Sequence, residues 1–213
     1  MQTTESMTYG LAFAGYSLES VQEILGISDG RAKKLRDQNL LRPTPDSGKG
    51  KRERFVGWDV EYLAAARQRA LPVTQPTLVC AMGVEHIAYQ VPSMFFDRND
   101  VAHGARVLDS VAEELPAEIN QLVADRTYRV TGHWKVSDED AKRLVEENGI
   151  AVASYTGFIL DGGRVIAEVP RHRWQGGGRC FIVEPFTGRE RTTYCHTYRT
   201  PKVGPVVEVV YPE

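Results

Sequence analysis

Nine basic side chains lie between Ser28 and Val56 in this chain of 213 residues. The nine are Arg31, Lys33, Lys34, Arg36, Arg42, Lys49, Lys51, Arg52 and Arg54, and only four acidic residues share the stretch. Clustered lysine and arginine bind a nucleic-acid duplex by releasing counterions from its phosphates. The chemistry indicated here is therefore phosphate binding and hydrogen bonding to bases, and a solvated charged surface is the alternative.

A second basic group lies near the C-terminus, around three consecutive glycines at 176–178. Arg171, Arg173, Trp174 and Arg179 surround these glycines. Basic residues interleaved with aromatic ones can hold phosphates and stack on bases, so one interpretation is a second nucleic-acid contact. The other is a loop whose charges protect a sheet edge against pairing.

The residues that support catalysis or metal binding are scattered. Cys80, Cys180 and Cys195 lie far apart, and no C-x-x-C or H-x-x-x-H spacing occurs, although zinc ligands usually come in such close pairs. The acidic run at 138–140 fits the start of a helix better than a carboxylate pair. The triple glycine lacks the Lys-Ser/Thr of a phosphate loop. We therefore expect no metal, no cofactor and no enzymatic activity.

Three helices and a hairpin are predicted to position the first basic group. Apolar residues follow one face from Leu18 to Leu25, with Ser17 as the N-cap and Gly26 ending the helix. After a second cap at Ser28 and Asp29, another helix is predicted to run to about Gln38. Two short helices joined by a tight glycine-containing turn form a helix-turn-helix, whose second helix enters the major groove.

A hairpin is predicted over residues 42–55, because a Pro/Gly/Ser/Asp cluster separates two short extended runs. A third helix is predicted from Asp59 to about Ala70. The aromatic residues Phe55, Trp58 and Tyr62 are expected to pack in the core.

Short motifs along this region occur in an informative order and spacing. The motifs are Tyr16-Ser17-Leu18, Leu25-Gly26-Ile27-Ser28, Leu40-Leu41-Arg42-Pro43, Arg54-Phe55 and Asp59-Val60-Glu61-Tyr62-Leu63. Residues 16–70 thereby resemble the winged helix-turn-helix of MerR-type transcription regulators and their excisionase relatives. The resemblance implies base and phosphate contacts by the second helix (Arg31, Lys33, Lys34 and Arg36), backbone contacts by the wing (Lys49, Lys51, Arg52 and Arg54) and a place at the wing base for Arg42. The long dimerising coiled coil of that family has no counterpart here, because Pro72 and Pro76 interrupt it.

The fold class predicted for the whole chain is α+β. A winged helix-turn-helix at 1–71 and a linker at 72–76 precede an α+β domain at 77–213 with a mostly antiparallel sheet. In that domain we predict helices over 100–126 and from Ser137 to about 148. We predict strands at 78–82, 86–89, 128–134 and 206–211, a hairpin of 150–160 with 164–169 around a turn at 161–163, and a hairpin of 179–184 with 191–198.

Composition excludes several classes of protein. Hydrophobic residues make up 42% and charged residues 25% of the chain, which is typical of a globular protein rather than a disordered tail. No apolar run is long enough for a membrane span, no secretory signal is evident, and the sparse cysteines fit a reducing cytoplasm. The net charge of −2 hides a contrast, since residues 1–70 carry +2, residues 71–170 carry −7 and residues 171–213 carry +3.

Together these observations predict a cytoplasmic, sequence-specific double-stranded-DNA-binding transcriptional regulator, a repressor of prokaryotic or phage type. Helix 29–38 would read the major groove and wing 42–55 would grip the backbone. The C-terminal domain would supply self-association, effector binding or the second DNA contact. Alternatives are an excisionase-like recombination or architectural factor, a small-molecule-sensing regulator, and an enzyme or protein adaptor that carries a helix-turn-helix.

Overall fold

The computed structural model describes residues 15–45, 47–48, 53–81, 117, 121, 128–131, 134–169, 178–202 and 207–213. The chain divides into two compact units, Met1–Ala70 and Leu71–Glu213. The segment expected as a linker packs within the second unit. The hydroxyl of Thr74 lies 3.2 Å from that of Tyr194, and the backbone N–H of Ile150 donates to the Pro76 carbonyl at 2.9 Å.

The described part of the first unit contains three helices and a two-stranded sheet. Its elements are β1 (Tyr16–Ser17), α2 (Leu18–Leu25), α3 (Asp29–Asp37), β2 (Arg54–Phe55) and α4 (Gly57–Arg67). Strands β1 and β2 pair antiparallel, which joins the start of α2 to the strand that precedes α4. The core side chains, all at most 1% exposed, are Val21, Leu25, Ala32, Leu35, Leu41, Phe55, Val60 and Leu63.

Local capping signals set the bounds of α2, as the sequence predicts. The Ser17 hydroxyl accepts the N–H of Ser20 at 3.1 Å, a cap that stabilises a helix by about 1 kcal/mol. Gly26 ends the helix with φ of 53°, a conformation that costs glycine little. The following helix, α3, begins after Ser28, which has the extended N-cap backbone but makes no side-chain cap bond.

Helix α4 begins two residues before the predicted start and corrects one expectation about the core. Phe55, just before it, is fully buried as expected. Trp58 and Tyr62, however, are 51% and 46% exposed. The helix instead buries the face that carries Val60 and Leu63, and at 100° per residue the two aromatic residues lie on the opposite face.

The described part of the second unit is an α+β fold with a seven-stranded, mostly antiparallel sheet. Its elements are β3 (Thr77–Ala81), β4 (Arg129–Val130), α7 (Asp138–Glu146), β5 (Ile150–Tyr155), β6 (Phe158–Glu168), β7 (Phe181–Pro185), α8 (Gly188–Tyr194), β8 (Thr197–Tyr198) and β9 (Val207–Val210). The strand order is β4-β7-β6-β5-β3-β9, with β8 also paired to β6, and the one parallel pair in this sheet of described strands is β3 with β5. The predicted strand 86–89 lies outside the described residues, as does the predicted helix 100–126 except for residues 117 and 121.

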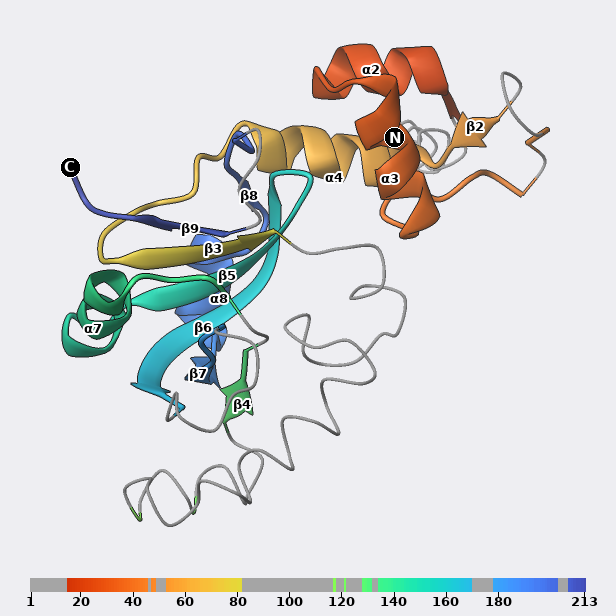
Figure 1. The fold of residues 1–213 in the computed structure, drawn as a ribbon. Coiled ribbons are helices and arrows are strands. Elements are labelled where there is room, and N and C mark those ends of the chain that lie inside the picture. The colour runs from red at the N-terminus through yellow and green to blue at the C-terminus, as the bar shows by residue number, and fades with distance from the viewer. Residues whose placement is uncertain are drawn as a thin grey trace, which may run out of the picture. The chain divides into compact units, whose positions relative to one another are not determined.

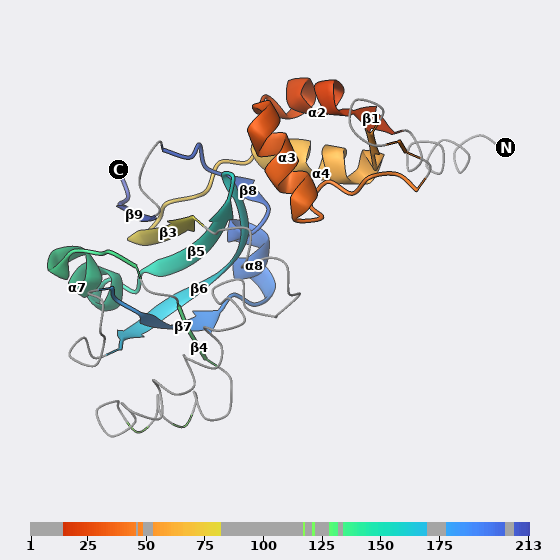
Figure 2. The same ribbon diagram turned by 45° about the vertical axis from the view of Figure 1, so that its right-hand side comes forward.

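Helices α7 and α8 cover opposite faces of this sheet (Figures 1 and 2). On one face, Tyr194 of α8 packs in a cluster with Val79 of β3 and Val152 of β5. On the other, α7 is joined to the chain end by a hydrogen bond from the Tyr211 hydroxyl to Asp140. As predicted, Ser137 caps α7 by accepting the N–H of Asp140 at 3.0 Å.

The turn predicted at 161–163 lies elsewhere. Thr156 and Gly157, with φ of 51° and 102°, make the turn between β5 and β6. Gly162 and Gly163 lie inside β6, where the strand is closely packed. A Cβ atom on Gly162 would lie 2.7 Å from the Ala151 carbonyl oxygen and would also meet the Phe186 ring. These glycines therefore permit close packing instead of a turn.

The hairpin predicted from 179–184 and 191–198 is also replaced. Residues Gly188–Tyr194 form α8, and the short strand β8 follows it and pairs with β6. The ring of Tyr194 stacks on Phe186 at a centroid distance of 4.9 Å within the cluster under α8. Burial of this ring outweighs the strand preference of the Thr-Thr-Tyr sequence.

Candidate nucleic-acid interface

Helix α3 presents its basic residues to solvent because its apolar residues share one buried stripe. Ala32 and Leu35 are fully buried against the first unit's core. The residues on the exposed face are Gly30, Lys33, Lys34 and Asp37, and half-buried Arg31 and Arg36 flank the buried stripe on either side. All four basic residues that the sequence places on this helix are thus accessible to a partner.

Lys33 is ion-paired along the helix. Its Nζ lies 2.6 Å from a carboxylate oxygen of Asp29, one turn earlier, and both side chains are about half exposed. Exposed pairs of this kind contribute roughly 0.5 kcal/mol. Lys33 can therefore exchange Asp29 for a phosphate at little cost.

Arg36 is held by two carboxylates from different parts of the chain. Its Nε and Nη2 donate to one oxygen of Asp37 at 2.9 and 2.7 Å, and its Nη1 donates to Glu53 at 3.2 Å. The hydrogen bond with Asp37, supported by that with Glu53, raises the pKa of Arg36 above its ordinary value. The contact to Glu53 joins α3 to the strand that returns from the hairpin.

Arg42 joins the outgoing strand of the hairpin to α4. Its Nη2 and Nε donate to Asp59 at 2.7 and 2.9 Å, and its backbone N–H donates to the same carboxylate at 2.9 Å. The hairpin base is closed by Val56 N–H to the Arg42 carbonyl (2.9 Å) and by Thr44 N–H to the Arg54 carbonyl (2.8 Å). The predicted hairpin is therefore present at its base, whereas Lys49, Lys51 and Arg52 lie outside the described residues.

Two cations of this unit, Arg31 and Arg54, differ from Lys33, Arg36 and Arg42 in their ion pairing. Arg54 is exposed on β2 and Arg31 is half-buried on α3. Neither forms an ion pair with another residue that the structure describes. No carboxylate among the described residues neutralises their positive charges.

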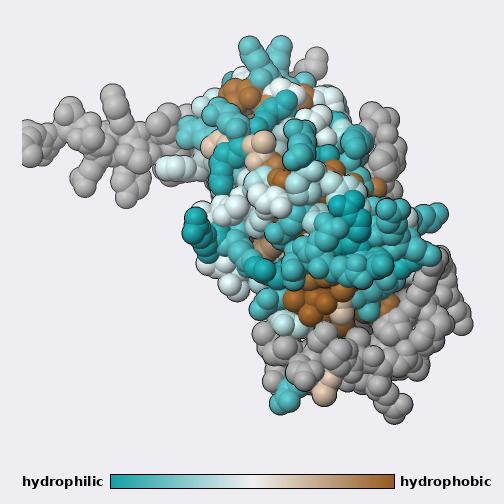
Figure 3. All heavy atoms as spheres, turned by 90° about the vertical axis from the view of Figure 1, so that its left-hand side faces the viewer, coloured by the Kyte–Doolittle hydropathy of each residue, from teal (hydrophilic) through white to brown (hydrophobic). Residues whose placement is uncertain are grey.

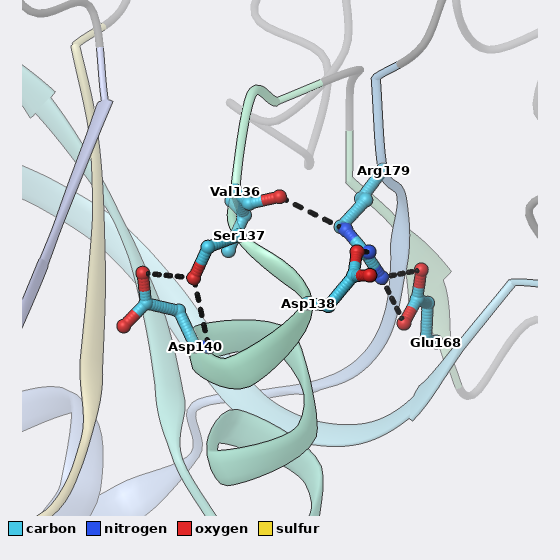
Figure 4. Close-up of polar contacts among 6 residues, drawn as sticks. All are labelled: Val136, Ser137, Asp138, Asp140, Glu168 and Arg179. Carbon is cyan, nitrogen blue, oxygen red and sulfur yellow. Dashed lines mark hydrogen bonds and ion pairs between the residues drawn. The ribbon is translucent and has the colours of Figure 1, made fainter.

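Arg179, predicted as part of the second DNA contact, is a structural residue instead. It is 5% exposed, its Nη1 donates to both oxygens of Glu168 at 2.6 and 2.7 Å, and its Nη2 donates to Asp138. Its Nε donates to the Val136 carbonyl at 2.9 Å, so the guanidinium connects α7 to the end of β6 (Figure 4). The expectation was wrong because the basic sequence pattern does not reveal burial. Arg171, Arg173 and Trp174 lie outside the described residues.

The three cysteines are buried thiols. None of Cys80, Cys180 and Cys195 forms a disulfide. Burial raises the pKa of the Cys195 thiol to about 11, and it raises that of Cys80 well above its usual range. Within the described ranges no group of three His, Cys, Asp or Glu side chains is placed to hold a metal ion.

We expect all three thiols to resist a maleimide reagent in the native protein near pH 8, because buried, protonated thiols are poor nucleophiles. Labelling should become complete in denaturant. Mass spectrometry of labelled samples measures both states. Rapid labelling of a native cysteine would instead indicate an accessible thiol and would favour the alternative of an enzyme.

A hollow in the second unit bears on the small-molecule alternative. It has a volume of about 60 Å³ and is lined by residues that include Ser154, Arg199, Lys202 and Glu208. Glu208 already bonds Arg199 and Lys202, each at 2.6 Å. Ligand pockets usually enclose roughly 300 Å³ or more, so this hollow does not suit an effector.

Comparisons of the chain with protein-family models, with curated proteins and with solved structures find no match. None of the helices in the described ranges has the length and apolar character needed to cross a membrane. On the face drawn in Figure 3 the described residues are mostly hydrophilic, with hydrophobic residues in small groups between them.

Proposed function

We propose that the first unit is a winged helix-turn-helix that binds double-stranded DNA, and that the chain is a transcriptional regulator of the repressor type. Helix α3 would enter the major groove and the hairpin 42–55 would lie on the flanking backbone. The observation that carries this proposal is the exposed basic face of α3 beside a hairpin fastened to α3 through Glu53 and to α4 through Asp59. These two ion pairs hold the base of the hairpin in place before DNA binds.

Phosphate affinity would come chiefly from cations that no carboxylate neutralises. In the proposed interface, Arg31 and Arg54 make no ion pair with a described residue, whereas Lys33, Arg36 and Arg42 are each ion-paired. A cation that already has a counter-charge displaces fewer phosphate counterions on binding. The salt dependence of binding should therefore depend more on Arg31 and Arg54 than on Arg42.

The test uses the full chain and duplexes selected from a random pool. Changing both Arg31 and Arg54 to Ala should reduce the slope of log K against log salt concentration by about 2, with about tenfold or greater loss of affinity. Arg189→Ala, at an exposed position of α8, is the matched control and should leave the slope unchanged. Fluorescence anisotropy over a salt series measures both quantities.

Two results would contradict the proposal. If the wild-type chain shows no salt-dependent affinity for any duplex, the first unit is a protein-interaction module. If the double variant keeps the wild-type slope, these two arginines do not contact phosphates. Self-association through the second unit remains a prediction, which symmetry in the selected sites would support.

A further inference from the structure

Arg36 differs from the other basic residues of α3 in how completely its guanidinium is fixed. Asp37 binds it from the same helix, and Glu53 binds it from the returning strand of the hairpin. The side chain of Arg36 remains 32% exposed, while that of Glu53 is only 14% exposed. A guanidinium bound from two directions, yet reachable from solvent, is oriented before any partner arrives.

We propose that Arg36 reads a guanine in the major groove, and that Asp37 and Glu53 are its positioning residues. This inference rests on the proposed DNA-binding function. It assigns to Arg36 a role in base specificity, distinct from the phosphate contacts expected of Arg31 and Arg54.

The donor count of Arg36 fits a base edge. A guanidinium has five N–H groups, and the bonds to Asp37 and Glu53 use three of them, on Nε, Nη2 and Nη1. One N–H remains on each terminal nitrogen. Guanine presents two acceptors in the major groove, N7 and O6, and an arginine with two donors on neighbouring nitrogens matches this pair.

The local charge disfavours a phosphate as the partner. Arg36 contributes one positive charge, and Asp37 and Glu53 contribute two negative charges within hydrogen-bonding distance of it. An approaching phosphate would be repelled by this net negative group, whereas a guanine edge carries no net charge. The carboxylates therefore favour a neutral acceptor at Arg36.

The first experiment compares the sequence preferences of the full chain and two variants in selection from random duplexes. Arg36→Lys keeps the charge but loses the fixed fork, and it should lower the preference for guanine at one position by about 5- to 150-fold. Its salt slope should stay within a few tenths of the wild-type value. Arg54→Ala is the matched control, and it should lower affinity for every sequence, reduce the slope by about 1 and preserve the guanine preference.

The second experiment replaces Glu53 by glutamine, which is similar in size but uncharged. If Glu53 positions Arg36 and cancels its charge, this variant should lose part of the guanine preference. It should also bind unrelated duplexes more tightly, with a salt slope increased by up to about 1. A purely structural role for Glu53 would instead weaken binding to all sequences and lower the unfolding temperature, so thermal unfolding is measured for each variant.

The outcomes distinguish a failure of the guanine contact at Arg36 from a failure of the proposed DNA binding. Uniform loss of affinity in Arg36→Lys, or an unchanged preference, overturns the guanine contact while leaving DNA binding intact. A wild-type chain that binds no duplex overturns the proposed function, and the inference with it. A guanine preference lost in Arg36→Lys and kept in Arg54→Ala supports both.

Discussion

Replacing Arg179 with alanine is expected to destabilise the second unit by about 2–3 kcal/mol, because its buried guanidinium makes charge-assisted hydrogen bonds while the side chains of its partners Glu168 and Asp138 are 24% and 82% exposed. The variant leaves Glu168 without its cation and the Val136 carbonyl without its donor. It also removes the link between the start of α7 and the end of β6 (Figure 4). Denaturant unfolding followed by circular dichroism measures the change.

Arg189→Ala provides the matched control for this experiment. Arg189 is exposed on α8 and makes no ion pair with a described residue, so its loss should change stability by less than about 0.5 kcal/mol. If Arg179→Ala unfolds like the wild type but binds DNA more weakly, the structural role assigned to Arg179 is wrong. The original expectation of a DNA contact at this residue would then return.

The second large effect is expected from Gly162→Ala. The added Cβ atom would stand 2.7 Å from the Ala151 carbonyl oxygen of the neighbouring strand and would meet the Phe186 ring. The carbonyl belongs to a paired strand and cannot move freely, so we expect destabilisation of about 3 kcal/mol. The midpoint of urea unfolding measures this loss.

Gly30→Ala is the contrasting glycine change. Position 30 lies in the first turn of α3, and a Cβ atom there would meet nothing within 4 Å. Alanine is a better helix former by up to about 1 kcal/mol, so this variant should be slightly more stable than the wild type. If Gly162→Ala and Gly30→Ala change the free energy of unfolding equally, close packing does not explain the glycine in β6.

The proposed interface also changes how the charge of this chain is interpreted. Counting residues gives nine cations near the proposed recognition helix and wing, but Lys33, Arg36 and Arg42 each have a carboxylate partner. The salt dependence of DNA binding should accordingly be smaller than the count suggests. The carboxylates of Asp37 and Glu53 would neutralise the charge of Arg36 and fix the orientation of its guanidinium.

Local signals in the sequence were sufficient for several elements. Ser17 and Gly26 mark the two ends of α2, and Ser137 marks the start of α7. These signals can be read from the sequence because a capping hydrogen bond or a left-handed glycine involves residues at most about four positions apart. The strand predicted at 206–211 is β9, and the strand predicted at 150–160 covers β5, the turn after it and the start of β6. The α+β class with a mostly antiparallel sheet followed from the order of these elements.

Contacts between distant residues were not predictable in this way. The Asp-Gly-Gly sequence at 161–163 resembles a turn, and only the neighbouring strands show that its glycines serve close packing. The sequence Thr-Thr-Tyr favours a strand, yet burial of Tyr194 makes it a helix. In both cases the deciding partner lies far along the chain, and local preference is worth less than the packing it opposes.

In the candidate site, too, the positions of the cations were predictable from the sequence, whereas their ion pairs were not. Helical periodicity placed Arg31, Lys33, Lys34 and Arg36 on one helix, and the family resemblance implied a place at the hairpin base for Arg42. The sequence could not show that Arg36 meets Glu53 and Arg42 meets Asp59, each 17 residues away, or that Arg179 is buried against Asp138, 41 residues away. Whether a cation is available to DNA depends on such pairings, because the carboxylate that cancels a charge is brought to it by folding and not by sequence proximity.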